Sequence, residues 1–326
     1  MMTNSSVMDS VLGFTVADAL GVPIEFKSRS ELRVNPLKEM IGYGSHNVPE
    51  GTWSDDTSMM LATMDSIIET NDIDYDDMMK KYCEWYAKSK YTATGVTFDI
   101  GISTRKALLN FYNGKAALDC GGKGEFDNGN GSLMRILPIA LYSFYNNLNE
   151  KEEIELLNNC SSMTHGHEIS KLGCKIYTDF IKKLLNGENK EKAFEQISNK
   201  DYSNYYSKES IEKYKRLFNK NFKDLNISQI KSSGYIVDTL EACIWCILNT
   251  HGYEDAVVKA INLGEDTDTI GAITGSIAGI IYGNKEIPER WKSKLRNKED
   301  LLGIIDKYND YLLNDVKKLE DNNVKK

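Results

Sequence analysis

The sequence predicts an all-α fold, and three observations support this prediction. Only five prolines occur in 326 residues, so few forced breaks interrupt the elements. The apolar–polar alternation typical of half-buried strands is scarce. Apolar residues instead recur with helical spacing in several separate stretches. These features together favour long helices over a sheet.

The first expected helix ends at a bend that carries an acid. Gly21 and Pro23 interrupt the helical pattern, so the helix should stop there and Glu25 should lie on the bend. Taken alone, Glu25 also fits an ordinary solvated loop acid. One face of this helix is formed by Val7, Val11, Phe14, Thr15 and Ala19.

A second helix is expected after Ser54. This serine stands where an N-cap would stand, and Asp55 and Asp56 fall in the first turn, where negative charge suits the helix dipole. The apolar stripe that follows comprises Met60, Leu61, Met64, Ile67 and Ile68.

Two further helices are expected near the C-terminal end. Residues 237–248 are apolar on most sides, and Gly252 is a plausible C-cap for them. Another stripe is made by Ile270, Ile273, Ile277, Ile280 and Ile281. Small residues lie between its members, namely Gly271, Gly275, Ala278 and Gly279. They predict a central helix that neighbouring helices approach closely.

The chain reads as one domain over residues 1–313 with a charged C-terminal tail at 314–326. Within the domain, residues 186–231 shift to Lys, Asn, Ser and Tyr, which indicates a more polar helical insertion or surface region. We expect this region to contribute residues to the rim of a cleft.

Composition narrows the class of protein. The formal net charge of −8 argues against a dedicated nucleic-acid binder, which usually has a basic face. We see no apolar run of about 18 residues and no signal peptide, so no membrane partner is expected. Six cysteines make no disulfide framework and fit a cytoplasmic protein. Cys243 and Cys246 have CxxC spacing but are expected to be core residues.

Two acidic clusters carry the strongest chemical signal. Residues 54–57 read Ser-Asp-Asp-Thr, and residues 265–269 read Glu-Asp-Thr-Asp-Thr. Each stands where a loop meets an apolar helix. Helix capping explains one acid but not several, because packed carboxylates repel one another unless protons or a cation neutralise them. Carboxylates and hydroxyls are the ligands of hard divalent cations.

Three alternative motifs fail. An EF-hand counted from Asp266 would need oxygen ligands where Ile270 and Ile277 stand. A DDxxD motif fails because Met59 occupies its last position. No GxxxxGK[ST] sequence occurs, so there is no P-loop. An all-oxygen site favours Mg²⁺ or Mn²⁺ over zinc.

Taken together, seven segments resemble the ADP-ribosylglycohydrolase family, in the family's order over most of the chain. They are residues 13–25, 51–57, 98–101, 129–135, 164–167, 234–241 and 264–269. Segments 98–101 and 129–132 look most like the bacterial dinitrogenase reductase-activating type, which removes ADP-ribose from an arginine side chain. The resemblance implies a compact orthogonal helical bundle with a binuclear metal cleft.

The resemblance also implies a ligand set for two Mg²⁺ or Mn²⁺ ions. Ser54, Asp55 and Asp56 would bind from one side, with Ser54 replacing the threonine common in the family. Glu25 would be a nearby or bridging ligand. The other side would be formed by Asp266, Asp268 and Thr269. Glu265 stands where the family often has glycine and is expected to point away from the metals.

Hydrolysis at ribose C1′ also needs a proton carrier and a site for the diphosphate. Glu25 or Asp99 is proposed as the carrier. Glycines favour backbone amides turned toward an anion, so Gly129, Asn130, Gly131 and Ser132 are expected to bind substrate, as is His165. Arg135 could pair with a phosphate or form a structural salt bridge, and the role of His167 is left open.

The sequence thus predicts a metal-dependent hydrolase that removes ADP-ribose from a protein or small-molecule acceptor, with protein arginine as the expected acceptor. Two alternatives stay open. One is an ADP-ribose or nucleotide binder without turnover. The other is hydrolysis of a serine, nucleobase or O-acetyl linkage. The sequence indicates no oligomeric state.

Overall fold

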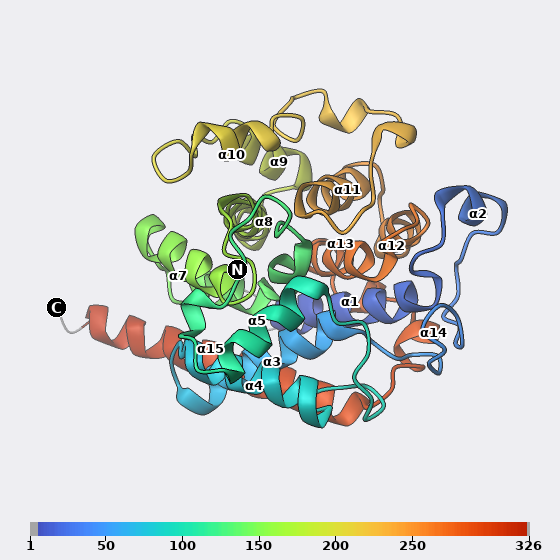
Figure 1. The fold of residues 1–326 in the computed structure, drawn as a ribbon. Helices are drawn as coiled ribbons and strands as arrows, with labels where there is room; N and C mark the ends of the chain where they lie inside the picture. The colour runs from blue at the N-terminus through green and yellow to red at the C-terminus, as the bar shows by residue number, and fades with distance from the viewer. Residues whose placement is uncertain (1–5, 325–326) are drawn as a thin grey trace.

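The computed structural model describes residues 6–324, with side chains through residue 314. In this part of the chain every regular element is a helix, and the only β-type pairings are two isolated bridges. The predicted all-α class is confirmed. Figure 1 shows α1 (Ser6–Gly21) and α13 (Thr267–Tyr282) in the interior, with the other helices around them.

The remaining helices surround this pair. The longer ones are α3 (Asp55–Thr70), α4 (Tyr75–Lys88), α5 (Ile102–Tyr112), α7 (Glu150–Ser162), α8 (Glu168–Leu185), α11 (Ile236–Leu248) and α15 (Lys298–Val324). The shorter ones are α2 (Arg29–Val34), α6 (Leu137–Tyr145), α9 (Lys190–Ser198), α10 (Lys208–Lys213), α12 (Tyr253–Ile261) and α14 (Glu289–Lys292). The 3₁₀ turns are η1 (Val22–Ile24), η2 (Ala117–Asp119), η3 (Asn130–Arg135), η4 (Phe222–Asp224), η5 (Ile227–Gln229) and η6 (Asn284–Glu286).

Glycines bring α1 and α13 into backbone contact. A Cβ added at Gly13 would lie 2.5 Å from the carbonyl oxygen of Gly275, and one at Gly271 would lie 2.9 Å from that of Ala17. A Cβ at Gly275 would overlap the carbonyl oxygen of Gly13. The predicted central helix and its close approach are therefore confirmed, and only glycine satisfies the spacing.

Helix α1 is buried on nearly every side rather than along one face. The expectation that no apolar stretch is long enough to span a membrane also needs correction. By length and composition Ser6–Ile24 qualifies, with a mean hydropathy of 1.5, but 94% of the stretch is buried inside the protein. Among the described helices, it is the single stretch that is long and apolar enough to span a membrane.

Local signals explain where several helices begin and end. Ser54 caps α3 by accepting a hydrogen bond from the Asp56 amide, as predicted. Gly252, in contrast, is not the C-cap of α11. That helix ends at Asn249, whose side-chain amide bonds the Trp245 carbonyl, and Gly252 precedes α12.

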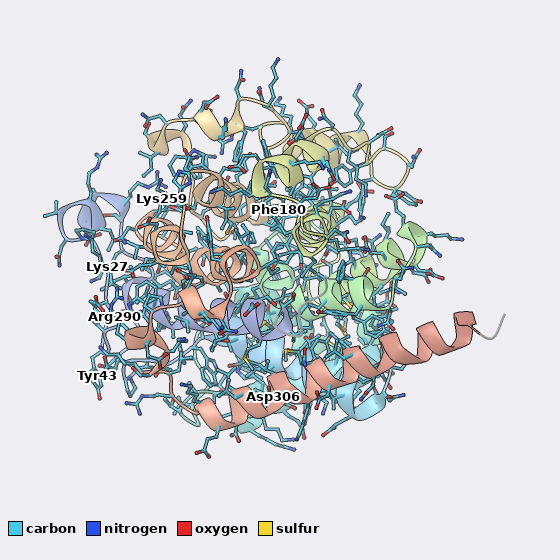
Figure 2. The ribbon with its side chains drawn as sticks, turned by 180° about the vertical axis from the view of Figure 1, so that it is seen from behind. Lys27, Tyr43, Phe180, Lys259, Arg290 and Asp306 are labelled. Carbon is cyan, nitrogen blue, oxygen red and sulfur yellow. The ribbon has the colours of Figure 1, made fainter. Side chains whose placement is uncertain are left out.

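The ends of the predicted domain are only partly described. Helix α15 continues through most of the expected tail, to Val324, and residues 325–326 lie outside the described part. Figure 2 shows α15 lying across the back of the molecule, with Asp306 on it. The polar region 186–231 contains α9 and α10 and lies beside α8 and α11 (Figure 1). The single-domain boundary at 313 stays a prediction.

The contact between α1 and α13 predicts a large effect of Gly275→Ala. The added methyl must push the helices apart, so the free energy of unfolding should fall by about 1–3 kcal/mol in urea denaturation. Gly303→Ala in α15 is the matched control, because a Cβ there meets nothing within 4 Å. It should raise stability by about 0.5–1 kcal/mol through helix propensity. Equal effects of the two substitutions would contradict this packing.

Candidate active site

A cavity of about 480 Å³ lies where seven separate segments meet, a volume typical of small-molecule sites. Its polar lining brings together predicted residues that are more than 200 positions apart in sequence. The predicted residues that line it are Glu25, Asp55, Asp56, Asp99, Gly129, Asn130, Gly131, His165, Asp266 and Thr269.

The packing of α1 against α13 places the first of these segments beside the last. Gly21 ends α1 directly against the backbone of Asp268, which leaves no room for a Cβ. Thr267 donates its hydroxyl to the Gly21 carbonyl at 2.8 Å. Backbone hydrogen bonds from Phe26 to Glu265 (2.7 Å) and from Glu265 to Lys27 (2.8 Å) tie the two loops together.

Five carboxylates converge at one side of the cavity, and all of them except Asp268 line it. Glu25, Asp266 and Asp268 each offer an oxygen, and these oxygens lie within 4.8 Å of one another. Asp55 and Asp56 join them from the first turn of α3 and are buried. The two clusters singled out in the sequence thus form one site.

This convergence is electrostatically unfavourable without a positive charge. Burial raises the pKa of Asp55, Asp56, Asp266 and Asp268, and the charges of neighbouring carboxylates raise it further. Burial, then the charges of Asp99 and Asp266, raises the pKa of Glu25 to about 11.

Two buried oxygens also lack a partner. Asp56 Oδ2 and Asp268 Oδ1 accept no hydrogen bond, although buried acceptors are normally satisfied. Partnerless carboxylate oxygens in an all-oxygen cluster fit a hard divalent cation. Thr269, which lines the cavity, adds a hydroxyl to this set.

Asp18 stabilises the first acidic cluster, residues 54–57, and the sequence alone did not predict this role. Its carboxylate accepts hydrogen bonds from the amides of Ser54 (3.0 Å) and Thr57 (3.1 Å) and from the Thr57 hydroxyl (2.6 Å). It thereby fixes the start of α3, where Asp55 and Asp56 lie. A carboxylate inside an otherwise apolar helix is a signal that could have revealed it.

Ser54 and Ser132 do not line the cavity. The Ser54 hydroxyl caps α3, which is a structural role, and the expected metal contact stays a prediction. Ser132 lies in the core, with its hydroxyl 3.0 Å from that of Ser161 and 3.5 Å from the Cys174 sulfur. Its position gives no support to the expected contact with substrate.

The segment of residues 129–132 lies between the acidic side of the cavity, at Asp266, and the ring of His165. Gly129 caps the 3₁₀ turn η3, and residues 130–132 belong to that turn rather than to a loop before an α-helix. Asn130 donates its side-chain amide to Asp266 Oδ2 at 2.7 Å and to the Thr239 hydroxyl at 2.9 Å, so it orients an acid of the second cluster. A Cβ at Gly131 would lie 2.7 Å from the His165 ring, so glycine makes room for that ring.

His165 lines the cavity as a neutral ring. Burial, and secondarily the Arg135 charge, lowers its pKa to about 3. Its Nδ1 lies 2.9 Å from the Thr164 hydroxyl. A neutral imidazole suits hydrogen bonding to a ligand rather than charge pairing.

Neighbouring predicted residues have structural roles. His167 caps α8 by accepting from the Ile169 amide at 3.2 Å. Arg135 faces neither a phosphate site nor a carboxylate. It is buried over the Tyr82 ring and donates to the Tyr82 hydroxyl, the Cys160 carbonyl and the Thr164 hydroxyl.

Glu265 is the first residue of the second acidic cluster, residues 265–269. This residue is exposed and does not line the cavity, as expected. Its φ of 64° is left-handed, a conformation that glycine adopts without strain.

No residue of the polar region 186–231 lines the cavity. Cys243 and Cys246 are buried core residues.

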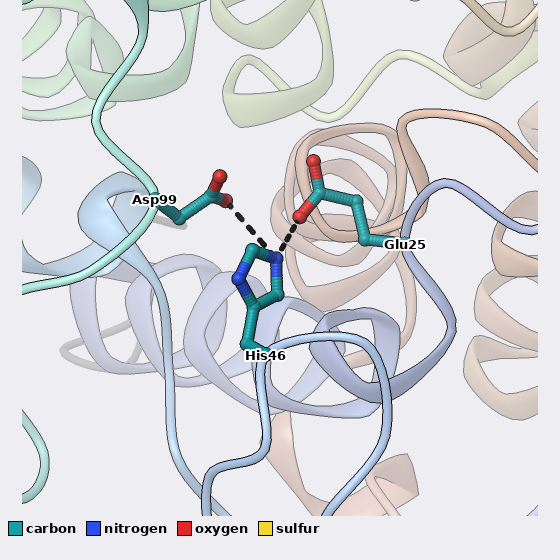
Figure 3. A group of neighbouring side chains, drawn as sticks. All are labelled: Glu25, His46 and Asp99. Atoms are coloured by element: carbon teal, nitrogen blue, oxygen red, sulfur yellow. Dashed lines mark hydrogen bonds and ion pairs between the residues drawn. The ribbon is translucent and has the colours of Figure 1, made fainter.

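His46 is the other residue that the sequence did not reveal. Figure 3 shows it between Glu25 and Asp99, with Nε2 in contact with Glu25 Oε2 and 3.8 Å from Asp99 Oδ2. Asp99 lies in a loop before α5 and has a left-handed φ of 57°. Nothing in the spacing of residues around His46 indicated this contact.

Comparisons with known proteins identify the family. The model of the ADP-ribosylglycohydrolase family matches residues 2–321. The chain belongs to the ADP-ribosylglycohydrolase family. The resemblance predicted from the seven segments is thereby confirmed, and with it the assignment of the chain as a glycohydrolase enzyme.

Named relatives cover most of the chain. It is 31% identical over 296 residues to ADP-ribosylarginine hydrolase Tri1 of Serratia proteamaculans, covering 89% of this chain and 75% of the relative. It is 28% identical to ADP-ribosyl-[dinitrogen reductase] glycohydrolase of Rhodospirillum rubrum, covering 90% and 92%. A solved ADP-ribosylglycohydrolase-related protein complex superposes with a TM-score of 0.78 at 25% identity, covering 95% and 98% of the two chains.

The hydrogen bonds of Asp18 predict a specific defect in Asp18→Asn. An amide cannot accept from both sides, so a buried N–H loses its partner at a cost of about 1–3 kcal/mol. The displaced α3 start should also weaken Mn²⁺ binding, measured by calorimetry. Asp9→Asn is the control, because Asp9 accepts from Asn284 at the far end of the same helix. It should leave Mn²⁺ affinity unchanged, and equal weakening in both variants would refute the proposed support.

The left-handed backbone at position 265 predicts that Glu265→Gly stabilises this glycohydrolase. Relief of the left-handed strain outweighs the added entropy of the unfolded chain by about 0.5–1 kcal/mol. Urea denaturation measures the change. Glu286→Gly, at an exposed position without positive φ, should instead destabilise the protein. A loss of stability in Glu265→Gly would count against this account.

Proposed function

We propose that this glycohydrolase removes ADP-ribose from an arginine side chain of a modified protein, by hydrolysis of the bond at ribose C1′. The main support is the convergence of two carboxylate clusters at the base of one cavity. The relatives named above act, by their names, on ADP-ribosylarginine and on ADP-ribosyl-dinitrogen reductase. A second Tri1, from Pseudomonas putida, is also 31% identical.

Two divalent cations, Mg²⁺ or Mn²⁺, are proposed as cofactors. The residues that would hold them are Glu25, Ser54, Asp55, Asp56, Asp266, Asp268 and Thr269. Such ions, when bound, lower the pKa of water and polarise oxygens of the substrate. The partnerless oxygens of Asp56 and Asp268 support this assignment.

The chain's own side chains supply the remaining steps. Glu25 or Asp99 would take a proton from water or return one to the leaving group, since both carboxylates line the cavity. Neutral His165 would hydrogen-bond the diphosphate or ribose. Gly129 and Gly131 would let a phosphate approach the backbone. Asn130 would act through Asp266, which it contacts.

The proposal extends to the setting of the enzyme. An ADP-ribosylated protein is the proposed substrate, and the cytoplasm is the proposed location. The six cysteines are free thiols, as is usual in a reducing compartment.

The test is a panel of arginine-, serine- and nucleobase-linked ADP-ribose and O-acetyl-ADP-ribose, with and without EDTA. We expect release from the arginine conjugate, loss of release in EDTA and recovery with Mg²⁺ or Mn²⁺. Asp55→Asn and Asp266→Asn should each reduce kcat at least about 10²-fold. Glu265→Gln, which removes an exposed charge one residue from Asp266, should retain activity.

Three outcomes would contradict the proposal. Release from no substrate, with tight binding of ADP-ribose, would favour a binding protein without turnover. Faster release from another linkage would replace arginine as the acceptor. Loss of activity in only one of the two aspartate variants would argue against a shared metal site.

A further inference from the structure

His46 is a partly exposed side chain to which the proposed reaction gives no role, yet it contacts Glu25 of the acidic cluster. It comes from the long loop between α2 and α3, and its side chain is only 13% exposed. As Figure 3 shows, its Nε2 faces the carboxylates of both Glu25 and Asp99. These two are the candidate proton carriers.

The loop is built to hold this ring beside Glu25. A hydrogen bond from the Tyr43 amide to the Val48 carbonyl (2.7 Å) closes the turn that carries His46. The Ser45 amide donates to the Pro23 carbonyl at 3.0 Å, and the Ser45 hydroxyl donates to the carbonyl of Glu25 itself. At Gly44 the loop approaches Pro23 so closely that a Cβ would overlap its carbonyl. The loop is thus fastened to the backbone segment that presents Glu25.

Two aromatic rings fix the plane of the imidazole. The Phe98 ring lies 5.1 Å from it and the Phe26 ring 5.6 Å, centroid to centroid. These residues are the sequence neighbours of Asp99 and Glu25. The ring that faces the two carboxylates therefore packs against the residues next to them.

Glu25 needs such a partner. One of its oxygens contacts His46, and the residue also belongs to the group whose oxygens lie within 4.8 Å of Asp266 and Asp268. Like charges on Asp99, Asp266 and Asp56 would otherwise turn its carboxylate away from the cluster.

We propose that His46 is a positioning residue that donates Nε2–H to Glu25 and aims this carboxylate at Asp266 and Asp268. Histidine in this role strengthens divalent-cation binding without touching the substrate. Groups that orient a metal-binding carboxylate typically change metal affinity or activity by about 10- to 100-fold. The kinetic part of the inference rests on the proposed function, and the metal-binding part does not.

The test compares His46→Leu, His46→Gln and His251→Leu in the full chain. Leucine removes the donor and keeps an apolar side chain, glutamine retains an N–H, and His251 is an exposed histidine outside the cavity. We expect His46→Leu to weaken Mn²⁺ binding about 10- to 100-fold in calorimetry, and to lower kcat by a similar factor with little change in KM. His46→Gln should recover most of both losses, and His251→Leu should match the wild type.

Two results would overturn the inference. One is an unchanged Mn²⁺ affinity in His46→Leu. The other is equal impairment of the leucine and glutamine variants together with a parallel fall in Tm measured without cation, which would mark a merely structural residue. If the wild type binds Mn²⁺ but hydrolyses no conjugate, the proposed function fails while calorimetry still decides the role of His46.

Discussion

The backbone contact between α1 and α13 is the constraint on which the site depends. Glycine at the crossing points lets the two helices approach more closely than any side chain would allow. Their adjoining ends consequently meet at Gly21 and Asp268, and the loops beyond them pair through Phe26 and Glu265. A carboxylate from residue 25 and the acids of 266–268 share one site for this reason. The rest of the cavity is assembled around that junction.

The junction brings several acids together, and no lysine or arginine is among the described residues that line the cavity. Burial and mutual repulsion raise the pKa of the clustered acids, and two of their oxygens lack partners. The surrounding polar contacts serve to orient these acids. Asp18 holds the start of α3, Asn130 holds Asp266, and His46 contacts Glu25. Partnerless carboxylate oxygens in such an arrangement fit the ligand preference of a hard divalent cation.

Backbone strain gathers at the same cavity. Phe26, Asp99 and Glu265 have left-handed φ angles, and each lies in a loop that enters or borders the site. Such conformations persist where the surrounding structure over-determines them, and they are common at functional sites. At Phe26 and Glu265 this over-determination comes from the backbone hydrogen bonds that tie their two loops together.

The sequence alone predicted the fold class and much of the acidic site of this protein. Helical spacing predicted the class, the small-residue stripe predicted the central helix, and clustered acids beside hydroxyls predicted a cation site, because each signal is local. The tertiary structure decided what depends on distant contacts. It determines that Asp18 bonds the Ser54 amide and that His46 contacts Glu25. It also determines that Ser132 lies in the core and that residues 186–231 do not line the cavity. A side chain's partner across a helix junction follows from packing, and no pattern of neighbours in the sequence encodes it.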